Sequence, residues 1–250
     1  MIDTPSILLV PLAAGFLVLT THVLLGVQVL KRGVVFIDLA IAQIAALGVM
    51  IAAALVHDPL VAGLGGAAAA LAGAGLVAWL SSRFPDLREA MIGLVYVGSA
   101  VLAVLWISVN PQESHQLATM LSGDVLWVTW LGLAPLAVVT LPFLLLHAAG
   151  HGSLTVGRGF YPWFAVLVSL SVPLLGLYLV FATLIVPAIV SATRPGLSWT
   201  GIVAMGTVAY ALGLLVSLSW DLPSGPCVVL ALIVVGAVAA GAARSMRSTR

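Results

Sequence analysis

Apolar residues run along this chain in long segments, and the short stretches between them hold most of the charged residues. The segments lie at residues 7–30, 34–56, 60–80, 91–109, 125–147, 163–192, 200–219 and 226–243. A helix that crosses a membrane needs about 20 apolar residues, so each segment predicts at least one membrane helix. The polar stretches are too short to fold separately, and residues 1–250 are therefore expected to form a single all-α transmembrane domain.

The segment at residues 163–192 is too long for one membrane crossing and short for two. As one helix it would span about 45 Å, whereas the hydrocarbon core of a bilayer is about 30 Å thick. We expect two shortened helices broken near Pro173 and Gly176, which makes nine membrane helices, against eight if the segment crosses once. Broken helices are tolerated where they are buried or line a cavity, so this pair is predicted to line a pathway through the bundle.

Basic residues in alternate loops predict the orientation of the chain. Cytoplasmic loops of membrane proteins carry the excess of lysine and arginine, and Lys31 and Arg32 follow the first apolar segment. If the broken segment crosses twice, Arg194 and the arginines of the C-terminus lie on the same side of the membrane as Lys31 and Arg32. The N-terminus is therefore expected outside and the C-terminus in the cytoplasm.

The composition excludes several classes of protein. Hydrophobic residues make up 62% of the chain and charged residues 7%, whereas soluble domains carry about 25% charged residues. A net charge of +1, without a basic stripe, argues against nucleic-acid binding. The single cysteine, Cys227, excludes an internal disulfide and a multi-cysteine metal site. The single lysine, Lys31, follows Leu30 rather than the glycine of a phosphate-binding loop, so any ATP hydrolysis must come from a partner chain.

Asp38 lies within the second apolar segment, where a carboxylate is unusual. An ionised side chain at the membrane centre costs at least about 2.5–3.5 kcal/mol, which makes such a residue a functional candidate. His22, at nearly the same expected depth, would allow the pair to bind a divalent cation or relay a proton. Gln43 is a candidate for the wall of the same pathway. Alternatively, Asp38 caps a turn or pairs with Arg32. His22 would then bond a backbone carbonyl, and Gln43 would join two helices.

The outer loop at residues 110–124 holds a second group of candidate ligands. Glu113 and His115 lie two positions apart and combine a hard oxygen ligand with a borderline nitrogen ligand. They are a candidate first stop for a metal ion at the membrane surface. The alternative is a solvated polar loop without a ligand.

Five strings along the chain together resemble the metal-ion ABC transporter permeases, which import zinc and manganese. The strings lie at residues 31–48, 89–96, 121–128, 179–188 and 220–226. The resemblance implies a homodimeric permease in the bacterial inner membrane. It also implies two ATPase subunits that bind ATP on the cytoplasmic side, and an extracytoplasmic metal-binding protein that delivers the cargo. No permanently bound cofactor is implied, since the divalent metal is transported, and the chain itself is not an enzyme.

Two positions depart from the family pattern. Many members carry a metal-binding aspartate followed four residues later by a histidine. The aspartate carries over to Asp38, whereas the histidine position holds Ala42, and Gln43 or His22 are the candidate substitutes. The cytoplasmic loop that couples to the ATPase is also short and rich in glycine. Its expected ATPase contacts, together with those of the preceding cytoplasmic loop, are Arg158, Phe160, Tyr161, Arg83 and Glu89.

The sequence thus favours the permease subunit of an ATP-driven importer for a divalent metal, with zinc preferred to manganese. One alternative is a proton-coupled secondary carrier or channel that uses Asp38. Such carriers often contain internal repeats around broken helices, and no clear repeat is present here. A second alternative is an ABC permease for a metal chelate or another small cargo, which the absent histidine favours.

Overall fold

The computed structural model describes residues 4–56, 58–109, 125–153 and 157–248, and the described chain is helical. Its α-helices are α1 (Thr4–Arg32), α2 (Ile37–Leu55), α3 (Pro59–Arg83), α4 (Arg88–Val109), α6 (Trp130–Ala148), α7 (Phe160–Leu175), α8 (Leu177–Thr193), α9 (Trp199–Trp220) and α10 (Ser224–Ser248). The short 3-10 helices η1 (Pro85–Leu87) and η3 (Val125–Trp127) precede α4 and α6. Seven described helices are long and apolar enough to cross a membrane, and α7 and α8 are shorter apolar helices. These findings confirm the expected all-helical membrane fold.

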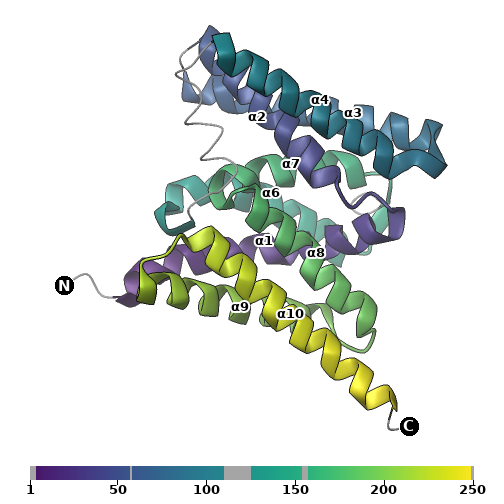
Figure 1. Ribbon diagram of the computed structural model, residues 1–250, viewed down its shortest axis with the longest axis vertical. Helices are drawn as coiled ribbons and strands as arrows, with labels where there is room; N and C mark the ends of the chain where they lie inside the picture. Colours follow the sequence, from purple (N-terminus) through teal and green to yellow (C-terminus); the bar gives the residue numbers. More distant parts are fainter. Residues whose placement is uncertain (1–3, 57, 110–124, 154–156, 249–250) are drawn as a thin grey trace.

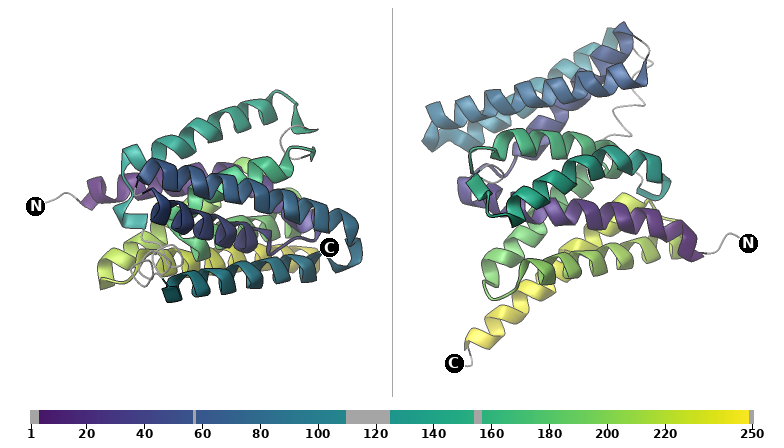
Figure 2. Two further views of the ribbon diagram at one scale, coloured as in Figure 1. Left: turned by 90° about the horizontal axis from the view of Figure 1, so that it is seen from above. Right: turned by 180° about the vertical axis from the view of Figure 1, so that it is seen from behind.

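The helices lie side by side, with α2, α3 and α4 on one side of the bundle and α9 and α10 on the other (Figure 1). α1, α6, α7 and α8 lie between these two groups, and the view from behind shows the same order (Figure 2, right). α1 packs mainly on α8 and α9, whereas α2 packs mainly on α3, α4 and α7. Helices that are adjacent in the sequence, α1 and α2, are therefore separated along most of their length.

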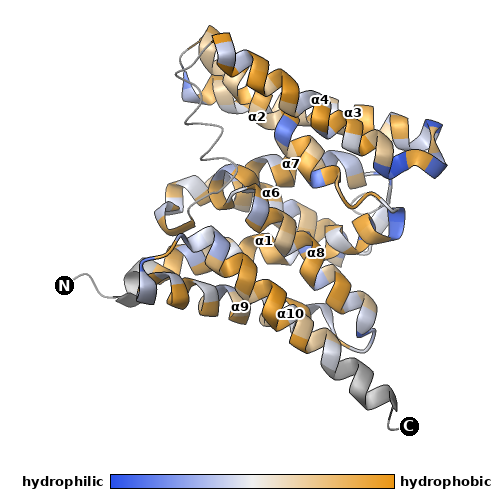
Figure 3. Ribbon diagram, in the orientation of Figure 1, coloured by the Kyte–Doolittle hydropathy of each residue, from blue (hydrophilic) through white to orange (hydrophobic). Residues whose placement is uncertain are grey.

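The middle of the bundle is hydrophobic, whereas its ends are more hydrophilic. Hydrophobic positions cover most of each helix, and hydrophilic positions gather near the ends (Figure 3). Arg88 Nη1 donates a hydrogen bond to the backbone carbonyl of Arg32 at 3.2 Å, which joins the start of α4 to the end of α1. Arg32 Nη2 donates to the carbonyl of Gly157 at 2.9 Å, which adds the loop before α7. We call this end of the bundle, with Arg32, Arg83, Arg88 and Arg158, the basic end.

The expected break in the long segment is present at Gly176. This residue joins α7 to α8 with φ 85° and ψ 153°, and Pro173 lies within the last turn of α7. α7 begins at the basic end. α8 returns toward it, because Ser191 of α8 and Gln28 of α1 line one cavity near the end of α1. The segment thus forms two short helices that run in opposite directions, as expected for two crossings.

We expect Gly176→Ala to lower the thermal unfolding midpoint of the purified protein by about 5 °C. The backbone conformation at Gly176 is one that residues with a Cβ adopt at a cost of about 1–3 kcal/mol, and each kcal/mol shifts the midpoint by about 2–4 °C. Gly75→Ala in α3 is the control, because its added methyl meets no atom within 4 Å. An unchanged midpoint for Gly176→Ala would show that the break does not depend on glycine.

Candidate functional site

Asp38 lies in the first turn of α2, where the chain turns back from the basic end. The turn is held by hydrogen bonds from the Val34 N–H to the Val29 carbonyl at 3.2 Å and from the Ile37 N–H to the Val34 carbonyl at 3.1 Å. Val34 and Ile37 are fully buried. Since Val29 precedes the end of α1 by about one helical turn, α2 begins inside the bundle rather than at its surface.

The Asp38 carboxylate is fully buried, and neither of its oxygens has a hydrogen-bond partner among the described residues. The pair with Arg32 considered above is therefore not formed in this structure. N–H groups in the first turn of a helix carry the positive end of its dipole, which favours a carboxylate at this position. That compensation is partial, because burying an unpaired ion costs several kcal/mol. A cation or a proton that reaches Asp38 removes this cost.

His22 is also fully buried, but it lies on the side of α1 that packs against α8. It precedes Gly26 by one turn, and Gly26 contacts Leu184 of α8. The His22 Nδ1 lies 3.1 Å from both the Val18 carbonyl oxygen and Thr21 Oγ1, as the backbone-bond alternative predicts. The Nε2 has no partner within the described residues. A proton on Nδ1 donated to Val18 leaves a lone pair on Nε2, which is the form of imidazole that binds metals.

The structure does not join His22 and Asp38 by a hydrogen bond, since the His22 Nε2 and both Asp38 oxygens have no partner among the described residues. His22 lies about 10 Å farther along α1 than Val29, at about 1.5 Å per residue, whereas Asp38 follows the turn that Val29 holds. The second apolar segment begins at residue 34, whereas α2 begins at Ile37, after the buried turn. No group of three or more His, Cys, Asp or Glu side chains in the described ranges is placed to hold a metal ion.

Of the remaining candidate ligands, Gln43, Glu113 and His115, only the first lies in the described part of the chain. Gln43 is buried on α2 and lies about 140° around the helix from Asp38, so the two side chains do not share a face. Glu113 and His115 lie outside the described residues. The described part of the chain therefore offers separate polar positions rather than one closed metal site.

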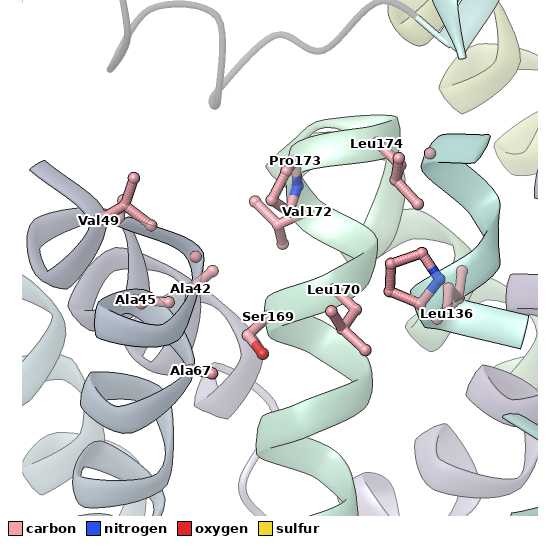
Figure 4. Close-up of a pocket in the computed structure, with 15 residues that line it drawn as sticks. Ala42, Ala45, Val49, Ala67, Leu136, Ser169, Leu170, Val172, Pro173 and Leu174 are labelled. Atoms are coloured by element: carbon pink, nitrogen blue, oxygen red, sulfur yellow. The ribbon is translucent and has the colours of Figure 1, made fainter. Parts of the chain in front are cut away.

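A cavity of about 220 Å³ lies between α2, α3, α6 and α7 (Figure 4). Its α2 wall is formed by Ala42, Ala45, Ala46 and Val49, which share a helix face with Asp38. The other lining residues are Gly63, Gly66 and Ala67 of α3, Gly132, Pro135 and Leu136 of α6, and Ser169, Leu170, Val172, Pro173 and Leu174 of α7. The lining is almost wholly apolar, and its nearest α2 residue to Asp38 is Ala42, one turn away.

The contribution of α6 to this cavity is not among the predictions from the sequence. Gly132, Pro135 and Leu136 carry no ionisable or metal-binding group, so nothing in their chemistry marks them. The available signal was the pair of prolines inside α6, Pro135 and Pro142, since proline within a membrane helix often lies beside a cavity or a kink.

Three of the five expected ATPase contacts are accessible at the basic end. Arg83 and Arg158 are exposed, and Tyr161 is half-buried. All three lie at or beside helix ends that meet there, at the end of α3 and the start of α7. Their positions are compatible with a partner that binds this end of the bundle.

The other two expected ATPase contacts, Phe160 and Glu89, make contacts inside the basic end. Phe160 is fully buried, with the Arg32 guanidinium carbon 4.5 Å from the centre of its ring, so it is not available for direct contact with a partner. Glu89 is half-buried, and its Oε1 accepts a hydrogen bond from the Val35 N–H at 2.7 Å. Both residues therefore hold the loops of the basic end in place.

Comparison with known proteins identifies the family. The model of the ABC 3 transport family matches residues 5–156 and 153–241. The fold is similar to that of PsaBC from Streptococcus pneumoniae, solved in complex with Fab, with a TM-score of 0.72 and 20% sequence identity over 93% of this chain and 90% of that chain. No curated protein matches the chain. Because the family model covers nearly the whole sequence, the chain belongs to the ABC 3 transport family, the metal-ion ABC transporter permeases that its motifs resemble.

Proposed function

We propose that this chain is the membrane-spanning subunit of an ATP-driven importer for a divalent metal ion. The observation that carries the proposal is the buried Asp38 carboxylate, whose oxygens have no partner in the described part of the chain. A divalent cation that has lost part of its hydration shell needs oxygen ligands, and a single carboxylate provides one without a complete coordination shell. Asp38 thereby lowers the cost of dehydration during passage and releases the ion again.

We infer that zinc is preferred to manganese, because the proposed route includes a nitrogen donor, His22. Imidazole suits zinc, whereas carboxylate, carbonyl and water oxygens suit manganese. His22 is buried, its Nε2 has no partner among the described residues, and it supplies a second donor. Glu113 and His115 supply the first contact at the outer mouth.

The proposed transporter contains two copies of this chain in the bacterial inner membrane. Two ATPase subunits bind at the basic end, where Arg83, Arg158 and Tyr161 are accessible, and an extracytoplasmic protein delivers the metal. The basic end faces the cytoplasm because lysine and arginine are concentrated on that side of membrane proteins, which places the N-terminus outside. ATP binding closes the ATPases and opens the path lined by Asp38 to alternate sides.

The apolar cavity favours a second candidate cargo, a metal chelate or another small molecule with an apolar surface. Its volume of about 220 Å³ exceeds what a single ion needs, and Ser169 supplies the only polar side chain in its lining. The histidine of the family pattern is replaced by Ala42, which lines this cavity. A chelate carries its own ligands and so requires fewer from the protein.

The importer assignment is tested by purifying the chain from its native membrane in mild detergent. We expect an ATPase with a phosphate-binding loop to co-elute in equal stoichiometry, and zinc with its delivery protein to stimulate ATP hydrolysis by the complex. Stimulation by a metal chelate but not by zinc would instead support the second candidate. A chain that elutes alone, and moves a cation along a proton gradient, would overturn the importer assignment and make Asp38 a proton-binding residue.

A further inference from the structure

A further cavity, distinct from the apolar cavity between α2, α3, α6 and α7, opens at the basic end. Its volume is about 230 Å³, and its lining consists of Arg32, Ala78, Ser81, Ser82, Arg88 and Tyr161. These residues come from the ends of α1 and α3 and the starts of α4 and α7. Five of the six carry a polar group, in contrast to the apolar cavity between α2 and α7. We call this cavity the arginine pocket.

Arg88, one of the two arginines that line the arginine pocket, is held by backbone carbonyls rather than by a carboxylate. Arg88 donates from Nε to the Ser81 carbonyl at 3.0 Å and from Nη1 to the Arg32 carbonyl at 3.2 Å. Both acceptors are neutral, and no carboxylate of the described chain pairs with Arg88. Glu89, the next residue, is directed to the Val35 N–H instead. Arg88 is thus held rigidly in a cavity that it shares with a second arginine.

A buried hydroxyl faces the same space. Ser81 is 4% exposed, it lines the arginine pocket, and its Oγ has no hydrogen-bond partner among the described residues. A buried polar group without a partner costs about 1–3 kcal/mol, so a ligand that accepts a hydrogen bond from Ser81 is favoured. Guanidinium groups combined with hydroxyl donors form the usual environment for a phosphate group.

The location of the arginine pocket indicates the source of that phosphate. Ser81 lies in the last turn of α3, at the end of a membrane-spanning helix. Earlier along α3, before Ser81, the exposed side chains include the apolar Leu76 and Trp79, which are 44% and 59% exposed. Basic pockets at the ends of membrane helices bind anionic lipid headgroups, and the acyl chains then lie along the apolar helix surface.

From this arrangement we propose that the arginine pocket binds the phosphate of an anionic phospholipid headgroup, with the acyl chains along α3. The headgroup phosphate accepts hydrogen bonds from Arg88 and Ser81 and satisfies both. This inference requires only that the chain spans a membrane, and it is independent of the transported cargo.

The test measures lipid retention by the full-length chain extracted from vesicles of equal phosphatidylglycerol and phosphatidylcholine. Native mass spectrometry should show phosphatidylglycerol retained in excess over phosphatidylcholine. We expect Arg88→Gln to reduce this excess about tenfold and Ser81→Ala to reduce it severalfold. The Ser81 hydroxyl bonds no described residue, so Ser81→Ala preserves the fold even if Arg88→Gln does not. Arg194→Gln is the matched control, since it removes a positive charge from the same end without lining the pocket.

A second arm distinguishes a lipid from a soluble anion. Inorganic phosphate at millimolar concentration is added to the detergent-solubilised protein, and the thermal unfolding midpoint is recorded for wild type and Ser81→Ala. A phosphate-dependent rise only in wild type, without selective retention of phosphatidylglycerol, would overturn the lipid source while supporting a phosphate site. Equal retention of both lipids in wild type and both variants, with no effect of phosphate, would overturn the proposal.

Discussion

Replacing Asp38 with asparagine is expected to reduce zinc transport by about 100-fold while the protein remains folded. Asparagine keeps the shape of the side chain and removes the charge from the only fully buried Asp, Glu, Lys or Arg in the described part of the bundle. Loss of one partner from a desolvated charge pair costs about 2–5 kcal/mol, and about 2.8 kcal/mol corresponds to 100-fold. The measurement is the initial rate of zinc uptake into proteoliposomes that contain the complete transporter.

The thermal unfolding midpoint separates this effect from misfolding. Asp38→Asn removes an unpaired buried carboxylate, so the midpoint should stay the same or rise. Asp58→Asn is the matched control, because Asp58 is an exposed cap of α3 and asparagine caps a helix equally well. Zinc uptake by Asp38→Asn at the wild-type rate would exclude Asp38 from the pathway. Normal uptake of a chelate with reduced uptake of zinc would favour the second candidate cargo.

The broken pair was predictable because three independent signals agreed. The segment at residues 163–192 is too long for one crossing, Pro173 and Gly176 interrupt it, and the arginines after it require an even number of passes. Gly176 has the backbone conformation that only glycine adopts readily, so the break is encoded locally. Length, charge and backbone chemistry are all properties of the sequence itself.

The start of α2 was not predictable from hydrophobicity. Val34, Val35 and Phe36 are apolar, so they continue the hydrophobic pattern although they form a turn. The turn forms inside the bundle, where Val34 bonds to Val29 of α1, and this contact depends on tertiary packing. The local signals that the first helix ends there were Gly33, which has φ 61°, and the basic residues Lys31 and Arg32.

Neither the apolar cavity nor the arginine pocket was predictable from the sequence, for a different reason. Asp38 and His22 are conspicuous because ionisable groups are rare in apolar segments. The residues around the apolar cavity are small or aliphatic and come from four helices, and no pattern along the chain links them. The arginine pocket likewise combines Ser81 and Arg88 with the end of α1, more than 45 residues earlier in the chain. Such sites are created by packing and are recognised only in the structure.

One added methyl group at Gly26 is expected to lower the thermal unfolding midpoint by about 10 °C. The Cβ of Gly26→Ala would overlap the backbone carbonyl oxygen of Leu184 and lie 3.1 Å from the Cβ of Ala188. Small residues let membrane helices approach this closely, and overpacking such a contact costs about 3 kcal/mol, or about 10 °C for a chain of this size. Gly93→Ala in α4 is the control, because its methyl meets no atom within 4 Å and should leave the midpoint unchanged or raised.

A second substitution identifies which atom opposes the methyl group. If the Leu184 carbonyl is the main obstacle, removing the other contact with Ala188→Gly recovers little of the stability lost by Gly26→Ala, because a backbone atom cannot rotate away. Recovery of most of the lost stability in the double variant would show instead that side chains alone set the distance between α1 and α8. His22 precedes Gly26 by one turn on the same face of α1, so the spacing that excludes a methyl group at Gly26 also positions its imidazole against α8. Zinc uptake by Gly26→Ala should therefore fall even at temperatures where the protein remains folded, whereas Gly93→Ala should transport at the wild-type rate.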